Sequence, residues 1–146
     1  CRARGENVVG MISLETIGFF TDEADSQRYP FPYGLFLPTT GNFVAFLSNL
    51  RSRYWAAQVA RLFREAASLP LVTQAVPAVV RRIGWSDDWG FWRENYPAFS
   101  VTDTAFLRYP HYHTLEDTPD KLDYGKMAVI VEALRHAIRK IAGLPA

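Results

Sequence analysis

Two kinds of stretch alternate along the chain: short apolar runs, and longer stretches whose apolar residues have helical spacing. The apolar runs have the length and composition of buried strands and predict strands over 8–15, 42–47 and 97–101. A further stretch over 71–80 has the β-branched character of a strand, broken by Pro77. Apolar positions three and four residues apart predict helices over 53–67 and 123–142, and a short helix is predicted over 89–95. Strands that alternate with helices indicate an α/β sandwich, in which ligands bind at the carboxyl ends of the strands.

The first strand and the last helix form the two ends of this pattern. The run from Val8 to Leu14 is almost continuously apolar, which is typical of a strand buried on both faces. We therefore expect this strand to have neighbours that come from sequence preceding the chain. The last helix is expected to leave His136 on the surface and to pack through one apolar face, formed by Met127, Ile130, Val131, Leu134, Ile138 and Ile141.

A long loop is predicted between the first two strands. The segment Thr21–Thr40 is rich in proline, tyrosine and phenylalanine and has no clear periodicity. Long loops in compact domains are often functional, but aromatic residues can also staple a loop that merely covers the sheet. Both interpretations stay open at this point.

Composition narrows the classes of function. The chain has 146 residues and a net charge of +1, which suits one globular domain and argues against a nucleic-acid partner, because such proteins need a strongly basic face. No uncharged apolar run approaches the roughly 18–20 residues that span a bilayer. The single cysteine, Cys1, allows neither an intrachain disulfide nor a cysteine-based zinc site. Any metal ligands must therefore be histidines and carboxylates.

Polar residues that could carry chemistry follow the apolar runs. Glu15 ends the first strand, where a buried carboxylate must be paired, hydrogen-bonded or bound to a metal. A structural salt bridge and a functional role both fit this position. Ser86, Asp87 and Asp88 precede the short helix, where they either cap its N-terminus or contribute to a site.

The densest polar group lies between residues 103 and 120. In an extended segment, His111 and His113 point to one side and Tyr112 points to the other. Either both histidines bind a metal, or one of them does so while Tyr112 donates a hydrogen bond across the cleft. A loop of purely structural histidines is a third interpretation. Thr118 and Pro119 then predict the start of a short helix.

Five sequence blocks, in order and spacing, resemble the C-terminal half of the co-catalytic zinc aminopeptidases, metallopeptidase family twenty-eight, to which glutamate carboxypeptidase and glutaminyl cyclase are related. The blocks are Gly10–Gly18, Ser86-Asp87, Pro97-Ala98, Thr102–Arg108 and Tyr112–Thr118. The resemblance covers nearly the whole chain. It implies that residues 1–146 form a single domain, the C-terminal portion of a catalytic domain with a three-layer α/β/α sandwich and a mixed, largely parallel sheet.

The resemblance also implies roles for individual residues. Glu15 and His113 stand where the family places zinc ligands, each serving a different ion of a zinc pair. Tyr112 stands where relatives stabilise the tetrahedral intermediate, and Asp87 matches an acid near the substrate. Asp88 departs from the family, which usually has histidine there. Further expected contributors are Phe106 and Tyr109, which would contact the first side chain of the substrate, and Asp117, which would orient a ligand.

The same resemblance leaves half of the active site outside the chain. The family's other zinc ligands and its general base precede the strand that ends at Glu15, but only fourteen residues precede Glu15 here and Glu6 is their only acid. We therefore expect a fragment of a zinc exopeptidase that hydrolyses N-terminal peptide bonds. Alone, it should hold no stoichiometric zinc and should not cleave peptides.

Two alternatives to this function are a non-catalytic peptidase-like domain that binds or assembles, and a cyclising acyltransferase of the glutaminyl cyclase type. The expected partners are a peptide or aminoacyl substrate together with a missing N-terminal half or a second copy of the chain. Relatives are often exported, so the resemblance favours an exported or periplasmic protein.

Overall fold

The computed structural model describes residues 1–76 and 86–145. Within these ranges the chain forms strands and α-helices in the order β1 (Met11–Glu15), β2 (Val44–Ser48), α1 (Arg53–Ala66), β3 (Leu71–Ala75), α2 (Asp88–Arg93), β4 (Ala98–Thr102) and α3 (Tyr124–Ile141). Short 3₁₀ turns lie at Arg2–Arg4, Tyr33–Leu35, Ala105–Leu107 and Pro119–Lys121.

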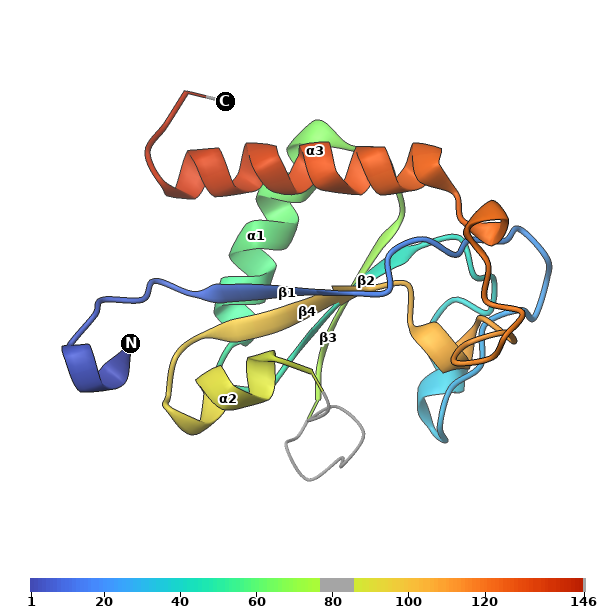
Figure 1. Cartoon of the computed structure of the whole chain (residues 1–146), viewed down its shortest axis with the longest axis horizontal. Coiled ribbons are helices and arrows are strands. Elements are labelled where there is room, and N and C mark those ends of the chain that lie inside the picture. The colour runs from blue at the N-terminus through green and yellow to red at the C-terminus, as the bar shows by residue number, and fades with distance from the viewer. Residues whose placement is uncertain (77–85, 146) are drawn as a thin grey trace.

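The four strands form one mixed sheet in the order β1-β4-β2-β3 (Figure 1). β1 and β4 are parallel, as are β2 and β3, while β4 and β2 pair antiparallel. The register sets Glu15 beside Thr102, and Thr102 beside Ala45. The carboxyl ends of β1 and β4 therefore meet the beginning of β2.

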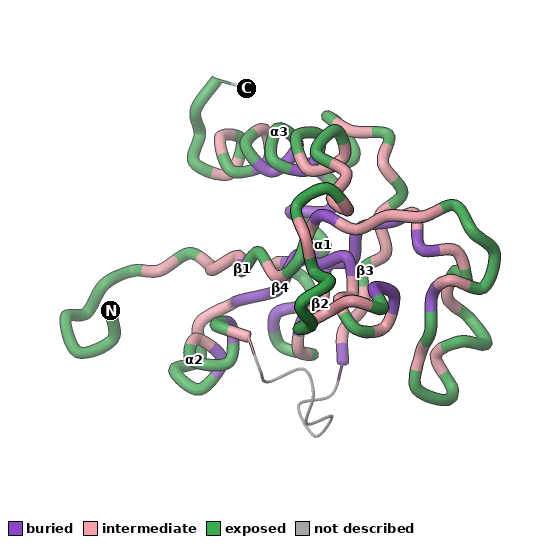
Figure 2. The backbone as a smooth tube through the Cα atoms, turned by 45° about the vertical axis from the view of Figure 1, so that its right-hand side comes forward, coloured by how far each residue is buried: buried purple, intermediate pink, exposed green. Residues whose placement is uncertain are grey.

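Helices α1 and α3 pack against each other and cover one face of the sheet (Figures 1 and 2). The side chains of alternate strand residues point to this face, as the two-residue period of a strand requires. The resulting core is formed by Val44, Phe46, Ala56, Val59, Ala60, Leu62, Phe63, Phe99, Val101, Ile130, Ala133, Leu134 and Ala137. Most of the buried hydrophobic area thus lies on one side of the sheet.

The opposite face carries less helix. Helix α2 packs there against β4 and β1, and the loops around residues 20–43 and 104–112 extend beyond the strand ends (Figure 1). The predicted sandwich with a mixed, mostly parallel sheet and helices is confirmed. On this second face, the helical layer in the described residues is the single short helix α2.

Local signals in the sequence explain where the main helices begin and end. The side chain of Asp123 accepts a hydrogen bond of 2.9 Å from the backbone N–H of Lys126, which caps α3. α1 ends at Ala66, a few residues before Pro70. The bounds of α1 and α3 fall within one residue of those predicted.

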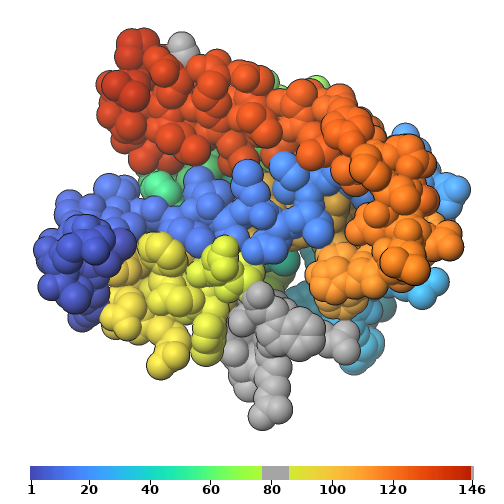
Figure 3. Space-filling model, viewed as in Figure 1, coloured from blue at the N-terminus to red at the C-terminus, as the bar shows by residue number. Residues whose placement is uncertain are grey.

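Two expectations about packing were wrong. β1 is an edge strand of the described sheet, and the side chain of Leu14 is half exposed rather than buried. Figure 3 shows the β1 segment at the surface between α3 and α2. On α3, Val131 and Ile138 are also about half exposed. The packed stripe is narrower than predicted because it runs through the small residues Ala133 and Ala137, which let α1 approach closely.

His136 lies at the edge of the α1–α3 contact, where its Nε2 atom is 3.5 Å from the carboxylate of Glu65. None of the described helices is long and apolar enough to cross a membrane. The part of the third predicted strand from residue 77 to 80 lies outside the described residues.

Candidate active site

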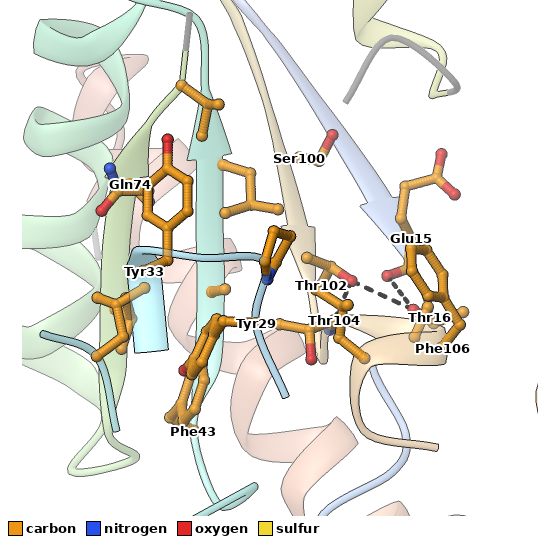
Figure 4. A pocket seen from close by; sticks show the side chains of 18 of the residues that line it. Glu15, Thr16, Tyr29, Tyr33, Phe43, Gln74, Ser100, Thr102, Thr104 and Phe106 are labelled. Atoms are coloured by element: carbon orange, nitrogen blue, oxygen red, sulfur yellow. Dashed lines mark hydrogen bonds between the residues drawn. The ribbon is translucent and has the colours of Figure 1, made fainter. Parts of the chain in front are cut away.

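A cavity of about 280 Å³ lies on the sheet face opposite α1 and α3 (Figure 4). All four strands line it with side chains that alternate with the core residues. The floor residues are Ala45, Leu47, Val72, Gln74, Ser100 and Thr102, and Glu15 at the end of β1 lies on the wall. Apolar groups dominate the lining, and the polar strand residues are those of β1 and β4 together with Gln74 of β3.

Two loop segments form the walls of the cavity. One is the aromatic loop between β1 and β2, which contributes Tyr29, Pro30, Tyr33 and Leu37. The other follows β4 and contributes Thr104, Ala105, Phe106, Leu107 and Tyr112. The predicted aromatic loop is therefore part of the cavity wall.

Tyr29 is a fixed part of this wall. Its hydroxyl donates a hydrogen bond of 2.7 Å to the backbone carbonyl of Pro38, within the same loop. Burial raises the pKa of Tyr29 to about 12, so the phenol stays neutral and acts as a donor.

Asp103 holds the bases of the two walls together. One of its carboxylate oxygens accepts hydrogen bonds from the backbone N–H groups of Gly18 and Phe19, at 3.0 and 2.8 Å. Its other oxygen accepts one from Ala105 at 2.9 Å. Burial raises the pKa of Asp103, but these backbone donors oppose that effect because they stabilise the ionised form.

Arg108 is a second buried link between the walls. Its guanidinium donates hydrogen bonds to the side chain of Gln27 at 2.9 Å and to the backbone carbonyl of Phe43 at 3.0 Å. The same group lies over the Phe43 ring, 4.5 Å from its centroid. Burial lowers the pKa of Arg108 to about 10, which still leaves it charged at neutral pH. Asp103 and Arg108 belong to the sequence block Thr102–Arg108, and both stabilise the cavity rather than line it.

Glu15 lies on the cavity wall at the end of β1 and is held by hydroxyl groups. Its Oε1 atom accepts hydrogen bonds from Ser13 at 3.0 Å and from Ser86 at 2.7 Å. Ser13 is on the same face of β1 two residues earlier, so the strand itself places the donor. The hydrogen-bond partners of this carboxylate within the described residues are hydroxyl groups, not a salt-bridge partner.

Asp88 turns inward from the start of α2 and is fully buried. Its Oδ2 atom accepts a hydrogen bond of 2.8 Å from Ser100 of β4, while Oδ1 has no partner among the residues that the structure describes. Burial, opposed by the Ser100 bond, raises the pKa of Asp88 to about 6, and the charge of Glu15 adds to the increase. Asp87, in contrast, is exposed at the N-cap of α2 and makes no side-chain capping bond.

Ser86 was among the residues that the sequence singled out, but Ser13, Ser100 and the inward turn of Asp88 were missed. The alternation of β1 and β4 could have placed Ser13 and Ser100 on the face of Glu15. The direction of Asp88 depends on how α2 packs, which no local pattern indicates.

Tyr112 lies in the cavity wall that follows β4, and His113 lies beside it, outside the lining. Tyr112 lines the cavity, while His113 is exposed with its ring stacked on that of Tyr112 at 4.0 Å. His113 has a positive φ of 59°, a backbone conformation in which histidine is enriched. Glu15 and Tyr112 thus share one cavity, and the ring of His113 is stacked beside it.

The other predicted site residues are distributed around this wall. Phe106 lines the cavity and lies 6.1 Å from the Tyr112 ring. Tyr109 is buried outside the cavity lining, with its ring 4.6 Å from Phe19 and 5.5 Å from His111. Burial raises the pKa of Tyr109, and the nearby charge of Asp117, an exposed residue, adds to this increase.

The described residues do not form a metal site on their own. Among residues 1–76 and 86–145, no three histidine, cysteine, aspartate or glutamate side chains lie close enough together to hold a metal ion. A zinc site requires three or four such donors. Glu15 and His113 are two, so the donor set in this part of the chain does not fit a complete zinc centre.

Comparisons with known proteins agree with this fold. No protein-family model matches the chain. Two crystal structures of the LapA aminopeptidase of Legionella pneumophila superpose with TM-scores of 0.64 and 0.65 over 93% of the chain. The chain has a peptidase-like fold. The sequence identities are 16% and 17%, so the likeness concerns the fold.

The proteins that the chain resembles are much longer than the chain itself. The chain matches the "Uncharacterized protein YfbL" of Escherichia coli strain K12 with 34% identity over 125 residues, which are 85% of this chain and 39% of that protein. It covers 31% and 32% of the two LapA chains. The chain therefore spans about a third of the length of the proteins that it resembles.

Proposed function

We propose that this chain is the substrate-binding part of an aminopeptidase-like exopeptidase, and that its cavity receives the N-terminal side chain of a peptide. The observation that carries the proposal is the apolar cavity of about 280 Å³ with Glu15 on its wall. Small-molecule sites have volumes of roughly 300–1,000 Å³, so a cavity of this size suits a single side chain. The aminopeptidase-like fold supports the reaction class.

The residues of the cavity suit this role. The largely apolar lining would bind a leucine or phenylalanine side chain, whose burial is worth about 1.5–3 kcal/mol. Tyr112 shares the cavity with Glu15, and its phenol can donate a hydrogen bond to an oxygen of the substrate. Ser13 and Ser86 bind one oxygen of Glu15 and so fix the orientation of this carboxylate.

We propose further that Glu15 and His113 contribute to a zinc site whose other ligands come from outside this chain. Two donors do not complete such a site, and zinc ions in hydrolases need several carboxylate or imidazole ligands. The other ligands and a general base would come from a longer polypeptide. The edge strand β1, which pairs only with β4 in the described sheet, offers unpaired backbone groups to which a strand of that polypeptide can add.

The cavity can be tested by filling it. Ala45 lies in its floor and is 2% exposed, so Ala45→Phe should occupy the space meant for a large side chain. In a longer polypeptide that contains this chain, we expect kcat/KM for leucyl- and phenylalanyl-anilides to fall about 10- to 100-fold, which corresponds to the lost burial. Alanyl-anilide hydrolysis should change far less, because its methyl group still fits.

Ala57→Phe is the matched control, since it introduces the same ring on the exposed side of α1. It should leave all three rates unchanged. An equal effect of Ala45→Phe on the three anilides, or no effect on any, would overturn the assignment of the cavity.

The second candidate is a non-catalytic peptidase-like domain that binds peptides. It is favoured by the lack of three clustered metal donors in residues 1–76 and 86–145. In this case the longer polypeptide would bind a peptide with an apolar N-terminal residue equally well with and without a chelator, and it would release no anilide.

A further inference from the structure

Three serine hydroxyls lie between the carboxyl groups of Glu15 and Asp88. Ser13 and Ser86 donate to Glu15, and Ser100 donates to Asp88. The Oγ atom of Ser86 is also 3.1 Å from that of Ser13 and 3.3 Å from that of Ser100. The result is a continuous chain of oxygen atoms from α2, across β4, to the end of β1.

This series of oxygen atoms has more hydrogen-bonding pairs than it has hydroxyl protons. Five oxygen pairs lie within hydrogen-bond distance, but the three serines supply only three hydroxyl protons. When both carboxyl groups are ionised, all three protons point to carboxylates, so the Ser86–Ser100 pair has none. A fourth proton on Asp88 lets Asp88 donate to Ser100, Ser100 to Ser86, and Ser86 to Glu15.

The surroundings of the two carboxyl groups favour Asp88 as the place for that proton. Asp88 is 0% exposed and its Oδ1 atom has no partner among residues 1–76 and 86–145, whereas Glu15 lies on the wall of an open cavity and accepts two hydroxyl donors. An ionised, buried oxygen without a partner is costly. The charge that faces Asp88 from β1 is that of Glu15, of the same sign, and β4 contains no charged residue. On its own helix, Arg93 is exposed in the last turn.

We propose that Asp88 is a positioning residue for Glu15, and that it acts through the hydroxyl groups of Ser100 and Ser86. When Asp88 carries a proton, the two hydroxyls donate in one direction and hold Glu15 in its place on the cavity wall. We call this one-way series of hydrogen bonds from Asp88 through Ser100 and Ser86 to Glu15 the relay. When Asp88 is ionised, Ser100 donates to Asp88 instead, so Ser86 still donates to Glu15 but no longer accepts a hydrogen bond from Ser100. The inference rests on the proposed function only for the importance that it gives to Glu15.

The relay can be tested by NMR on the metal-free, ¹³C-labelled chain of 146 residues, with no need for activity. We expect the Asp88 carboxyl carbon to titrate with a midpoint near pH 6. The Glu15 carboxyl carbon should show a smaller step in chemical shift at the same pH, because the hydrogen bond from Ser86 weakens when Ser100 no longer donates to Ser86. A midpoint for Asp88 near the ordinary value of 3.8 would overturn the proposal.

Variants distinguish an effect of Asp88 on Glu15 through the serine hydroxyls from a direct effect of the Asp88 charge. In Ser100→Ala the Asp88 midpoint should rise further, since its ionised form loses a donor, while the smaller step of Glu15 should vanish. In Asp88→Asn that step should also vanish, because the amide replaces the protonated acid as a permanent donor to Ser100. Persistence of the step in Ser100→Ala would mean that Asp88 acts through its charge alone, and the relay would be refuted.

Glu94→Gln is the matched control, because it removes one negative charge at the other end of α2 and should leave both titrations unchanged. The wild-type titration decides the first part of the proposal even if a variant does not fold. None of these results depends on zinc or on hydrolysis, so a failure here leaves the cavity experiment with Ala45→Phe intact, and the reverse holds as well.

Discussion

Asp88 is a fully buried acid, and one of its two oxygens has a hydrogen-bond partner within the described part of the chain. Burial raises its pKa from an ordinary value of 3.8 to about 6. The folded chain therefore binds this proton more tightly than the unfolded chain does. By linkage, such a group makes the fold less stable as the pH rises through this interval.

This gives a prediction for the dependence of stability on pH. Between about pH 4 and pH 7, Asp88 should reduce the free energy of unfolding by on the order of 3 kcal/mol, from the difference between about 6 and 3.8. In Asp88→Asn this part of the pH dependence should be absent, so the variant should gain stability relative to the wild type as the pH rises. Urea unfolding at pH 4.5 and 7.5 measures both values.

Glu94→Gln serves as the control for this experiment, since Glu94 is exposed at the end of the same helix. Its unfolding free energy should follow that of the wild type at both pH values. Parallel curves for wild type and Asp88→Asn would show that the Asp88 carboxyl is not destabilised by burial.

The sequence indicated individual site residues only in part. It singled out Glu15 and Tyr112, and the structure places both at one cavity. His113 was also singled out, and it lies beside that cavity on the ring of Tyr112. The sequence could not distinguish Asp87 from Asp88, because which of two adjacent acids points inward depends on the packing of α2. The roles predicted for Glu15, Tyr112 and His113 stay predictions.

At the scale of elements, the contact between α1 and α3 depends on small residues. Ala133 and Ala137 are 1% and 0% exposed, and they lie in the core beneath the two helices. Small side chains let helix axes approach, so larger ones at these positions would force the helices apart or distort rotamers.

We expect Ala137→Leu to destabilise the fold by about 1–3 kcal/mol, as is usual for an overpacked core. Ala128→Leu makes the same change on the exposed side of α3 and should be nearly neutral. The midpoints of urea unfolding test both. Equal effects of the two substitutions would show that α3 does not pack through this stripe.

Elements with a strong period were the most predictable. Helices α1 and α3 were predicted almost to the residue, since each has a regular apolar stripe and a clear signal at one end. β1 was predicted too long, and its burial on both faces was wrong. An apolar run indicates that a strand is hydrophobic, but the exposure of its side chains depends on which other strands pair with it. In the described sheet β1 has one neighbour, β4.

At the scale of the whole molecule, the chain matches about a third of an aminopeptidase in fold and 39% of its relative YfbL in length. The described residues include too few clustered donors for a zinc site. The proposed zinc centre therefore requires side chains beyond residues 1–76 and 86–145.

We predict that the isolated chain of 146 residues has no aminoacyl-anilide hydrolase activity and does not bind zinc stoichiometrically. Release of the chromogenic amine and isothermal titration with zinc measure the two properties. A longer polypeptide containing the chain should hydrolyse the same anilides, and a chelator should abolish this activity. Turnover by the isolated chain with added zinc would contradict the expectation that the site is incomplete.

The carboxylate of Asp103 has a consequence for how specificity can change. Its hydrogen bonds connect the backbone at Gly18 and Phe19 to the backbone at Ala105. The segments from which the two walls start are therefore held together where β1 and β4 end. The width between them is then set by main-chain geometry and not by the rotamers of the lining residues. Exchange of residues such as Leu47 or Val72 can accordingly reshape the cavity without loosening its frame, and under the proposed function single substitutions of this kind would change the substrate preference.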